Sequence, residues 1–454
     1  MRETTVHVVS LGCPKNLVDS EVMAALLAQA GCRIVSGPED AEILLLNTCA
    51  FILPAREESI DEIFRLAEWK KQGKCRHLIV AGCLAQRHGA ELAAELPEVD
   101  LFLGISEVPH IAEHLQVLME RESTPRTNRS IVPKPLFLMD AGHPRLLSTP
   151  THSAYLKIAE GCSNRCTYCV IPQIRGKARS RPVEDILREA YGLADRGVRE
   201  LILIAQDTTA YGRDLPGKPT LALLLRELAD LDSLAWIRIL YTYPTGLTDE
   251  LFKVIAQQDR ICSYLDVPIQ HIDDDILAAM KRHGDSRLIR KKLERARAAI
   301  PDLALRTSLI VGFPGETPAK FNRLLAFVQE TRFDHLGVFP YSPEEGTLAE
   351  KMPRQVSERT KKARRNLLME EQAVISHEIN QTLVGSRQEV LIEGSSTSPD
   401  FPLIGRCRRQ APDIDGVTYV KSGVQLLPPG SLIPCRIVAA DDYDLYAEAI
   451  PTPD

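Results

Sequence analysis

The fold is decided by a loop with three cysteines, Cys162-Ser163-Asn164-Arg165-Cys166-Thr167-Tyr168-Cys169, which directly follows a strand-like run near residues 155–159. Three thiolates on one loop can hold three irons of a four-iron cluster and leave the fourth iron open. Zinc is the alternative, but a structural zinc site needs four protein ligands and this loop supplies only three. We therefore predict that Cys162, Cys166 and Cys169 bind an iron-sulfur cluster.

The chain around this loop alternates strands with helices. Strand-like runs recur near residues 155–159, 200–205, 236–241, 263–268, 304–311 and 334–340, each followed by a helical pattern. Six such units predict a partial (β/α)6 barrel, whose working face is the C-terminal end of its strands. After the barrel, the charged segment 356–380 predicts a solvated surface helix that joins two domains.

The N-terminal region predicts a second site with three cysteines. Strand-like runs at 6–9, 42–46 and 77–81 alternate with helical patterns, which indicates an open parallel sheet covered by helices. One cysteine follows each of these strands, namely Cys13, Cys49 and Cys83. A single one would be read as a buried apolar thiol. Because ligands bind beyond the carboxyl ends of parallel strands, three in register favour a second cluster.

The remaining segments complete an α/β protein with three domains. Proline and polar residues in 121–153 predict a linker that lies over the surface. Short β-like runs at 388–392, 403–406, 417–420 and 433–438 predict a small all-β barrel of the oligonucleotide-binding (OB-like) type. The predicted boundaries are 1–120 for the open parallel α/β sheet domain, 121–153 for the linker, 154–380 for the partial barrel and 381–450 for the small β-barrel.

Composition narrows the class of protein. Of the 454 residues 44% are apolar, the formal net charge is -6, and no apolar run is long enough to span a bilayer. The opening Met1-Arg2-Glu3-Thr4 is charged and unlike a signal peptide. We expect a cytoplasmic protein with no membrane partner, in which eleven cysteines indicate metal or redox chemistry better than disulfides. The five other cysteines are read as core or surface thiols: Cys32, Cys75, Cys262, Cys407 and Cys435.

The triplet, with an aromatic residue before its last cysteine, resembles the hallmark of the radical S-adenosylmethionine (SAM) superfamily. The run Leu309-Ile310-Val311-Gly312-Phe313-Pro314-Gly315-Glu316 resembles that superfamily's strand-five segment, which packs against the cofactor. The resemblance implies that SAM binds here and is cleaved to a carbon radical. It makes Tyr168, Gly312 and Glu316 candidate cofactor-binding residues. No general acid or base is expected, because hydrogen abstraction by a radical needs no tuned titrating group.

Two arginines that follow the triplet are further candidates. Arg175 and Arg179 could neutralise cofactor or substrate carboxylates by bidentate pairing. The alternative is that they are ordinary solvated loop residues.

The order of the three domains resembles that of the methylthiotransferases, and the resemblance covers essentially the whole chain. In that family the last domain is a TRAM barrel. That resemblance implies two 4Fe-4S clusters, one SAM that methylates a sulfur and a second SAM that is cleaved to the radical. Segments that resemble the branch acting on an aspartate of small-subunit ribosomal protein S-twelve are 10–21, 204–212, 265–271 and 411–417. The branch acting on transfer RNA adenosine, which is the alternative, usually carries Gln-Met where this chain has Pro14-Lys15. The implied partners are the ribosomal protein, an electron donor such as flavodoxin or ferredoxin, and a sulfur donor.

Charge in the last domain gives a separate test of the partner. Residues 381–454 carry six basic and ten acidic residues, which suits a basic ribosomal protein better than a phosphate backbone. A solvated acidic surface is the plain alternative, and RNA contact is the less favoured one. The stretch 394–409 departs from the family in its Ser, Pro and Arg content, with Arg406, Arg408 and Arg409 clustered. A rival class is an iron-sulfur carrier without catalysis, which would transfer a cluster and cleave no SAM.

Overall fold

The computed structural model describes residues 4–120, 129–422 and 427–451, and the chain divides into two compact units. Unit 1 comprises Met1–Ser148, Lys157–Ile186 and Glu344–Thr347, and unit 2 comprises Thr149–Leu156, Leu187–Pro343 and Leu348–Asp454. The triplet loop, Cys162 to Cys169, therefore belongs to unit 1 together with the N-terminal sheet. The domain boundaries at 120, 153 and 380 stay a prediction.

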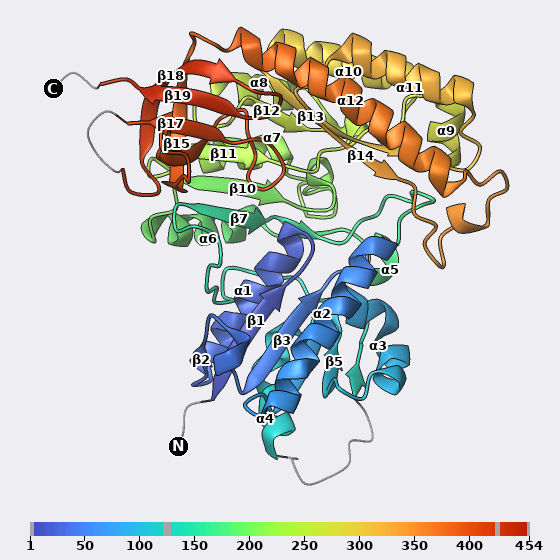
Figure 1. Ribbon diagram of the computed structural model, residues 1–454, viewed down its shortest axis with the longest axis vertical. Coiled ribbons are helices and arrows are strands. Elements are labelled where there is room, and N and C mark those ends of the chain that lie inside the picture. Colours follow the sequence, from blue (N-terminus) through green and yellow to red (C-terminus); the bar gives the residue numbers. More distant parts are fainter. Residues whose placement is uncertain (1–3, 121–128, 423–426, 452–454) are drawn as a thin grey trace. The chain divides into compact units, whose positions relative to one another are not determined.

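Unit 1 is built on a six-stranded sheet of order β2-β1-β3-β4-β5-β6, in which every pair is parallel. Its strands are β1 (Thr5–Ser10), β2 (Arg33–Ile34), β3 (Ile43–Thr48), β4 (His77–Gly82), β5 (Leu101–Leu103) and β6 (Ser130–Ile131). Its helices are α1 (Pro14–Gln29), α2 (Leu53–Gln72), α3 (Cys83–Glu95) and α4 (Ile111–Glu120), with short η1 (Pro38–Asp40) and η2 (Ile105–His110) (Figure 1). The open parallel α/β sheet is as predicted.

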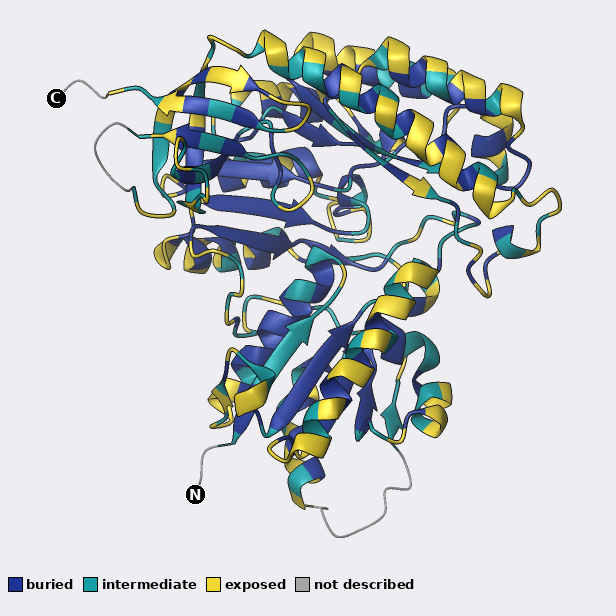
Figure 2. Ribbon diagram, in the orientation of Figure 1, coloured by how far each residue is buried: buried dark blue, intermediate teal, exposed yellow. Residues whose placement is uncertain are grey.

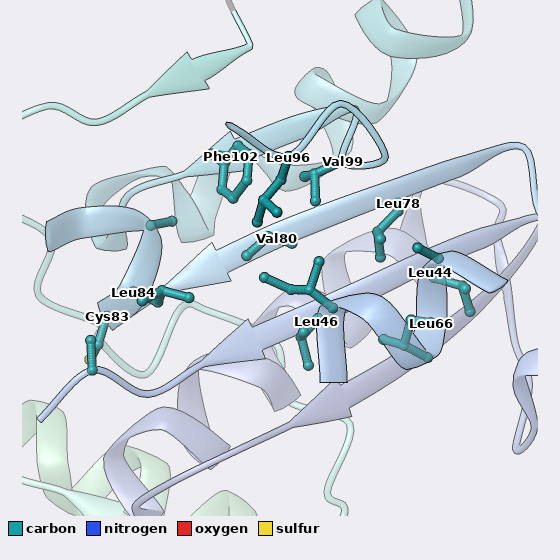
Figure 3. Packing of buried hydrophobic residues seen from close by; sticks show 14 of the residues in the cluster. Leu44, Leu46, Leu66, Leu78, Val80, Cys83, Leu84, Leu96, Val99 and Phe102 are labelled. Carbon is teal, nitrogen blue, oxygen red and sulfur yellow. The ribbon is translucent and has the colours of Figure 1, made fainter. Parts of the chain in front are cut away.

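The core of unit 1 lies between the central strands and their covering helices. Every residue of β3 and β4 is buried, which explains their near-continuous apolar sequence. Figure 3 shows Leu46 of β3 and Val80 of β4 beside Leu66 of α2, with Leu84 of α3 close to the strand end. The sheet therefore holds the residues after its strand ends on a rigid base.

The predicted linker is partly built into unit 1. Its residues 121–128 lie outside the described residues. Farther on, β6 pairs with β5 as an edge strand. Arg145 is buried, and its Nε donates to Glu21 of α1 at 3.1 Å. Most residues from 129 to 150 are half-buried or exposed, which agrees with a segment that lies over the surface. The two-residue strand and the long-range ion pair are contacts that leave no local sequence pattern, so they were not predicted.

Unit 2 contains the barrel strands in two parallel three-stranded sheets, β11-β10-β7 and β12-β13-β14. An isolated bridge between Ile237 and Ile261 lies between the two sheets. The strands are β7 (Ser153–Lys157), β10 (Glu200–Ile204), β11 (Trp236–Ile239), β12 (Tyr264–Asp266), β13 (Ala304–Val311) and β14 (His335–Pro340). The helices and turns that follow the strands are α6 (Val183–Asp195), η3 (Thr208–Ala210), α7 (Leu221–Ala229), η4 (Pro244–Gly246), α8 (Asp249–Gln257), α9 (Asp274–Ala279), α10 (Ser286–Ala299), α11 (Pro318–Thr331) and η5 (Ala349–Lys351). Six βα units were predicted, and six are present.

The long charged helix α12 (Glu358–Thr382) is more than a solvated connection. One face is buried, and Gln372 and Ser376 donate to the carbonyls of Phe333 and Asp334 at 2.7 and 3.0 Å. Figure 2 shows this helix with an exposed outer stripe and buried inner positions. The prediction of a surface helix holds for its outer face, but it did not include the inner face, where polar residues bind the backbone that leads into β14.

A closed five-stranded barrel ends unit 2, in the order β15-β16-β17-β19-β18. Its strands are β15 (Arg387–Ser395), β16 (Leu403–Cys407), β17 (Thr418–Lys421), β18 (Leu432–Ala440) and β19 (Leu445–Ala449). Its core contains Val390, Leu403, Val420 and Ile437. The small β-barrel is confirmed, with one strand more than the sequence patterns indicated.

Strand β16 and the loop that follows it join the small five-stranded β-barrel to the strands β10, β11 and β12 of unit 2. Arg406 donates to Glu200 of β10 at 2.6 Å, and Glu200 also accepts from Arg238 of β11 at 2.9 Å. Asp415 accepts from the Tyr264 hydroxyl of β12 at 2.7 Å. We call this set the ionic seam: Glu200, Arg238, Tyr264, Arg406 and Asp415. The ionic seam gives Arg406 a structural role.

Across the described parts of the chain, no helix has the length and apolar character to cross a membrane.

Candidate functional site

The three N-terminal cysteines lie at one edge of the unit 1 sheet. Cys13 is the N-cap of α1 after β1, Cys49 follows β3, and Cys83 is the first residue of α3 after β4. Strands β1, β3 and β4 are neighbours, and Thr48 is in register with Gly82. We call these cysteines the second cysteine site. The predicted convergence is therefore observed in the backbone arrangement, with Cys83 beyond the carboxyl end of the sheet (Figure 3).

Gly12 allows Cys49 to approach the turn that carries Cys13. Its φ is +88°, and a Cβ at this position would lie 2.6 Å from the Cys49 Cβ and 2.9 Å from its Sγ. Buried amides fix the same turns, since the Asn16 side chain donates to the carbonyls of Leu11 and Thr48 at 2.8 and 3.1 Å. The sequence Gly12-Cys13-Pro14-Lys15-Asn16 is thus explained by close packing of two cysteine-bearing turns.

The three thiols influence one another's ionisation. Burial raises the pKa of Cys49 to about 12, and the neighbouring Cys83 adds to this. Burial also raises the pKa of Cys83, against the opposing effect of Arg175. For Cys13 burial acts in the same direction, but Lys15 and Arg175 outweigh it and the pKa is lowered. Because metal ligands must be thiolates, a bound cation would remove most of this cost.

Backbone hydrogen bonds hold the triplet loop at its start and within its last turn. Cys162 N donates to the carbonyl of Gly176 at 3.0 Å, and Cys169 N donates to that of Cys166 at 3.2 Å. All three cysteines of the loop are half-buried. Gly161, with φ +78°, has no room for a Cβ, which would lie 2.3 Å from the carbonyl oxygen of Lys177. A fixed loop with accessible sulfurs suits a cluster that keeps one iron open to a ligand.

A buried set of four charged residues lies in unit 1 between the segments that carry the two sets of cysteines. We call Asp19, Lys157, Glu160 and Arg175 the charged quartet. Lys157 donates to Asp19 and, at 3.0 Å, to Glu160. Arg175 donates to Asp19 at 3.1 Å and to Glu160 at 3.0 Å, and all four side chains are at most 3% exposed. Burial alone would raise the pKa of Glu160, but Arg175 and Lys157 lower it below its usual value.

Arg175 and Arg179 bind the protein's own groups instead of lying in solvent. Arg175 Nη2 donates to the Asn16 side chain at 3.1 Å and reaches the Cys83 sulfur at 3.5 Å. Arg179 Nη1 donates to the carbonyl of Pro135 at 2.7 Å. The expectation that both neutralise cofactor or substrate carboxylates is not what their contacts indicate. Arg175 instead pairs with the carboxylates of the charged quartet.

The turn after β13 in unit 2 carries the other two candidate cofactor residues. The Glu316 carboxylate accepts from the backbone N–H of Gly312 and of Phe313, and lies 3.2 Å from Arg364 of α12. Burial raises its pKa to about 7. At Gly312 the φ is +74°, and a Cβ would lie 2.2 Å from the Lys361 Cγ. Gly312 therefore packs closely against a lysine side chain of α12, and its contact with SAM stays a prediction.

Sequence reasoning missed three members of the charged quartet. Asp19, Lys157 and Glu160 were not singled out, although Lys157 stands in a strand whose every residue is buried. A buried lysine of this kind signals a partner carboxylate. Within the described residues, no three His, Cys, Asp or Glu side chains have the spacing for a metal ion. The thiolates of a four-iron cluster each bind a different iron and therefore stand farther apart than the ligands of one ion. The absence of such a single-ion group from the described parts of the chain is thus compatible with a cluster at each set of three cysteines.

Three family models match the chain: the uncharacterized protein family UPF0004 over residues 5–104, the radical SAM superfamily over 156–328, and the TRAM domain over 384–450. A relative in Syntrophus aciditrophicus, "Ribosomal protein uS12 methylthiotransferase RimO", is 84% identical over 454 residues, which is 100% of both chains. A relative of the same name in Geobacter sulfurreducens is 53% identical and covers 98% of each chain.

Solved structures with a similar fold are more distant in sequence. The radical SAM methyltransferase TsrM from Kitasatospora setae superposes with a TM-score of 0.54 at 15% identity, covering 88% of this chain and 80% of that one. The cobalamin-dependent SAM radical enzyme OxsB superposes with a TM-score of 0.52 at 12% identity, covering 82% and 56%. At this identity the likeness supports the fold alone.

Proposed function

Because the chain belongs to the family of ribosomal protein uS12 methylthiotransferases, we propose that it attaches a methylthio group to the β-carbon of an aspartate in uS12. One SAM donates the methyl group and a second SAM is the source of the radical. The observation that carries this proposal is the presence, in one compact unit, of the triplet loop and the second cysteine site. The relatives that match over the full length support the ribosomal protein, not transfer RNA, as the substrate.

Two 4Fe-4S clusters and SAM fit the residues available. Cys162, Cys166 and Cys169 would hold the cluster that reduces SAM to the radical, and the second cysteine site would hold the cluster that handles sulfur. The donor sets suit this, since each consists of three sulfurs on well-anchored turns. An open iron on each cluster is what separates this chemistry from a closed structural zinc site.

The protein's own residues fix the turns and exclude water. Tyr168, Gly312 and Glu316 are our candidates for contacts with SAM. The Glu316 side chain holds its turn by accepting two backbone N–H groups. No side chain is assigned a proton transfer, because hydrogen abstraction by a carbon radical leaves no proton to be handled at the reacting carbon.

A protein partner suits the β-barrel better than a phosphate backbone does. Three of the six basic residues in 381–454 are Arg406, Arg408 and Arg409. Arg406 is buried and binds Glu200, so it is not available to a phosphate. Arg408 and Arg409 are half-buried and already bind the carbonyls of Ile261 and Asp302. RNA contact through the TRAM barrel would rest on the few basic residues that remain. An electron donor such as flavodoxin or ferredoxin and a sulfur donor complete the proposed partners, and the protein would act in the cytoplasm.

The test is mass spectrometry of tryptic uS12 peptides from a strain that lacks the gene. The methylthio increment on an aspartate should disappear and return when the wild-type gene is restored. A gene with Cys162, Cys166 and Cys169 replaced by Ala should not restore it. Transfer RNA nucleosides from the same strains are digested in parallel. An increment that is lost from adenosine and retained on uS12 would overturn the proposal.

A further inference from the structure

We propose that Arg175 is a positioning residue for the second cysteine site: it donates an N–H···S hydrogen bond to the Cys83 thiolate and raises the reduction potential of the cluster held there. This inference rests on the proposed function, because it takes Cys13, Cys49 and Cys83 to be cluster ligands. It goes further because it assigns the tuning of this cluster to a residue that follows the triplet loop in the chain.

The two terminal nitrogens of the Arg175 guanidinium contact different groups. Nη1 faces carboxylates, at 3.1 Å from Asp19 and 3.0 Å from Glu160. Nη2 faces the Asn16 side chain oxygen at 3.1 Å and the Cys83 sulfur at 3.5 Å. The side chain is 1% exposed. Since the fork is planar and rigid, contacts at one end orient the other end toward the sulfur.

The charged quartet places a positive end next to the thiol. It contains two cations and two carboxylates, so its formal charge is zero. Lys157, however, binds only Asp19 and Glu160 among the quartet, while Arg175 also reaches the sulfur. In a buried site such a nearby charge is poorly screened. Hydrogen bonds to ligand sulfurs and nearby charges are what set the potential of an iron-sulfur cluster, and a donor stabilises the more negative, reduced state.

The position of Arg175 in the chain makes it a link between the two sets of cysteines. It ends α5 (Ile171–Ile174), the turn that follows the triplet loop, and its N–H donates to the carbonyl of Ile171 at 2.8 Å. Its partner Glu160 lies in β8 (Ala159–Glu160), just before the triplet, and β8 pairs with β9 (Arg179–Ser180). The backbone that carries the triplet therefore supplies the hydrogen-bond donor to the second cysteine site.

The experiment uses the full chain with Cys162, Cys166 and Cys169 replaced by Ala, so that only one cluster contributes to the signal. Its midpoint potential is measured by a redox titration followed by electron paramagnetic resonance. Arg175→Gln should make the one-electron reduction about tenfold less favourable, a shift of about 59 mV downward. Glu160→Gln removes a negative charge beside Arg175 and should shift the potential upward. Arg175→Lys keeps the charge and should fall between wild type and Arg175→Gln.

The matched control is Arg181→Gln. Arg181 is also a fully buried arginine of unit 1, and it binds Asp185 at 2.8 Å and the carbonyl of Lys157 at 2.8 Å. Its replacement should leave the potential unchanged. Equal shifts in the Arg175→Gln and Arg181→Gln proteins, or shifts of one sign for Arg175→Gln and Glu160→Gln, would overturn the inference. If the Arg175→Gln protein loses its iron, Arg175→Lys and Glu160→Gln are compared instead. A downward shift for Arg175→Lys and an upward shift for Glu160→Gln support the inference, and shifts of the same sign overturn it. A triple-alanine background with no iron-sulfur absorbance contradicts the proposed function instead.

Discussion

Units 1 and 2 each contain buried arginines that pair with carboxylates, but the guanidinium groups make different additional contacts. In unit 1 the second nitrogen of Arg175 reaches the thiol of Cys83. In unit 2 the corresponding nitrogens of Arg406 and Arg238 reach the carbonyls of Gln410 and Arg408 at 3.1 and 2.8 Å. A buried ion pair therefore does not reveal a functional site by itself. A cysteine also lies near each network, because Cys262 interacts with Arg238 of the ionic seam. What distinguishes the charged quartet is that Arg175 donates to Cys83, which follows a strand end beside those of Cys13 and Cys49, whereas Cys262 precedes β12.

Replacing Cys162, Cys166 and Cys169 together by Ala is expected to have the largest effect. Formation of 5′-deoxyadenosine from SAM should become undetectable, because no cluster is left to reduce the sulfonium. Iron should fall from about eight to about four atoms per chain, since the second cysteine site is intact. Iron analysis and chromatography of the products measure both. The matched control replaces Cys407 and Cys435, which are buried in the β-barrel. This control protein should keep all its iron. If the variant without Cys162, Cys166 and Cys169 still cleaves SAM, the assignment of these cysteines is disproved.

Arg406→Ala tests whether the ionic seam is structural. It leaves the buried Glu200 with one fewer cation, so the free energy of unfolding of unit 2 should fall by about 3 to 5 kcal/mol. The chain has two tryptophans, Trp69 in unit 1 and Trp236 in unit 2. In a Trp69→Phe background, Trp236 fluorescence during urea unfolding therefore reports unit 2.

The control for the ionic seam is Arg436→Ala, at an exposed position of the same β-barrel. It should change stability by no more than about 0.5 kcal/mol. The iron content of unit 1 should be the same in both variants. An Arg406→Ala protein that loses iron without losing stability would remove the distinction between the two ion networks.

Parallel strands and their termini could be predicted from the sequence because their signal is local. The apolar runs that form β1, β3 and β4 fix where each strand ends, so the common edge of Cys13, Cys49 and Cys83 follows from topology alone. Strand β19 was missed because its run Leu445-Tyr446-Ala447-Glu448-Ala449 contains residues that do not favour strands. Its place is decided by pairing with β17 and β18.

The charged partners could not be predicted, because they join residues far apart in the chain. Arg175 and Asp19 are separated by 156 positions, and Arg406 and Glu200 by 206. Arg406 was noticed as unusual, yet nothing local distinguishes a buried arginine from a solvated one. Gly312 was predicted to contact the cofactor, and this stays a prediction; what the structure adds is Lys361, a side chain close to Gly312 from a helix that was predicted to lie on the surface.

The smallest expected effect is a pH dependence of stability that compares two buried glutamates, Glu160 in unit 1 and Glu316 in unit 2. Glu160 faces two cations and its pKa is lowered, whereas burial raises the pKa of Glu316 to about 7, against the effect of Arg364. A raised pKa means that Glu316 contributes stability below about pH 4.5, and that this contribution is lost as the pH rises through 7. His271 acts oppositely, since burial lowers its pKa to about 3 and its contribution is lost in acid. The wild-type pH profile therefore mixes the two.

Glu316→Gln separates them. The variant lacks the titrating carboxyl, so its stability relative to wild type should rise by about 3 kcal/mol between pH 4.5 and pH 7, at 1.36 kcal/mol for each unit of pKa shift. Trp236 fluorescence in the Trp69→Phe background measures this in urea. Glu330→Gln, at an exposed position of α11, should show no such rise. A flat difference for Glu316→Gln would mean that Arg364 balances this carboxylate as fully as the charged quartet balances Glu160. The two glutamates would then be equally well paired, and the remaining difference would be that Arg175, the partner of Glu160, also reaches the Cys83 sulfur.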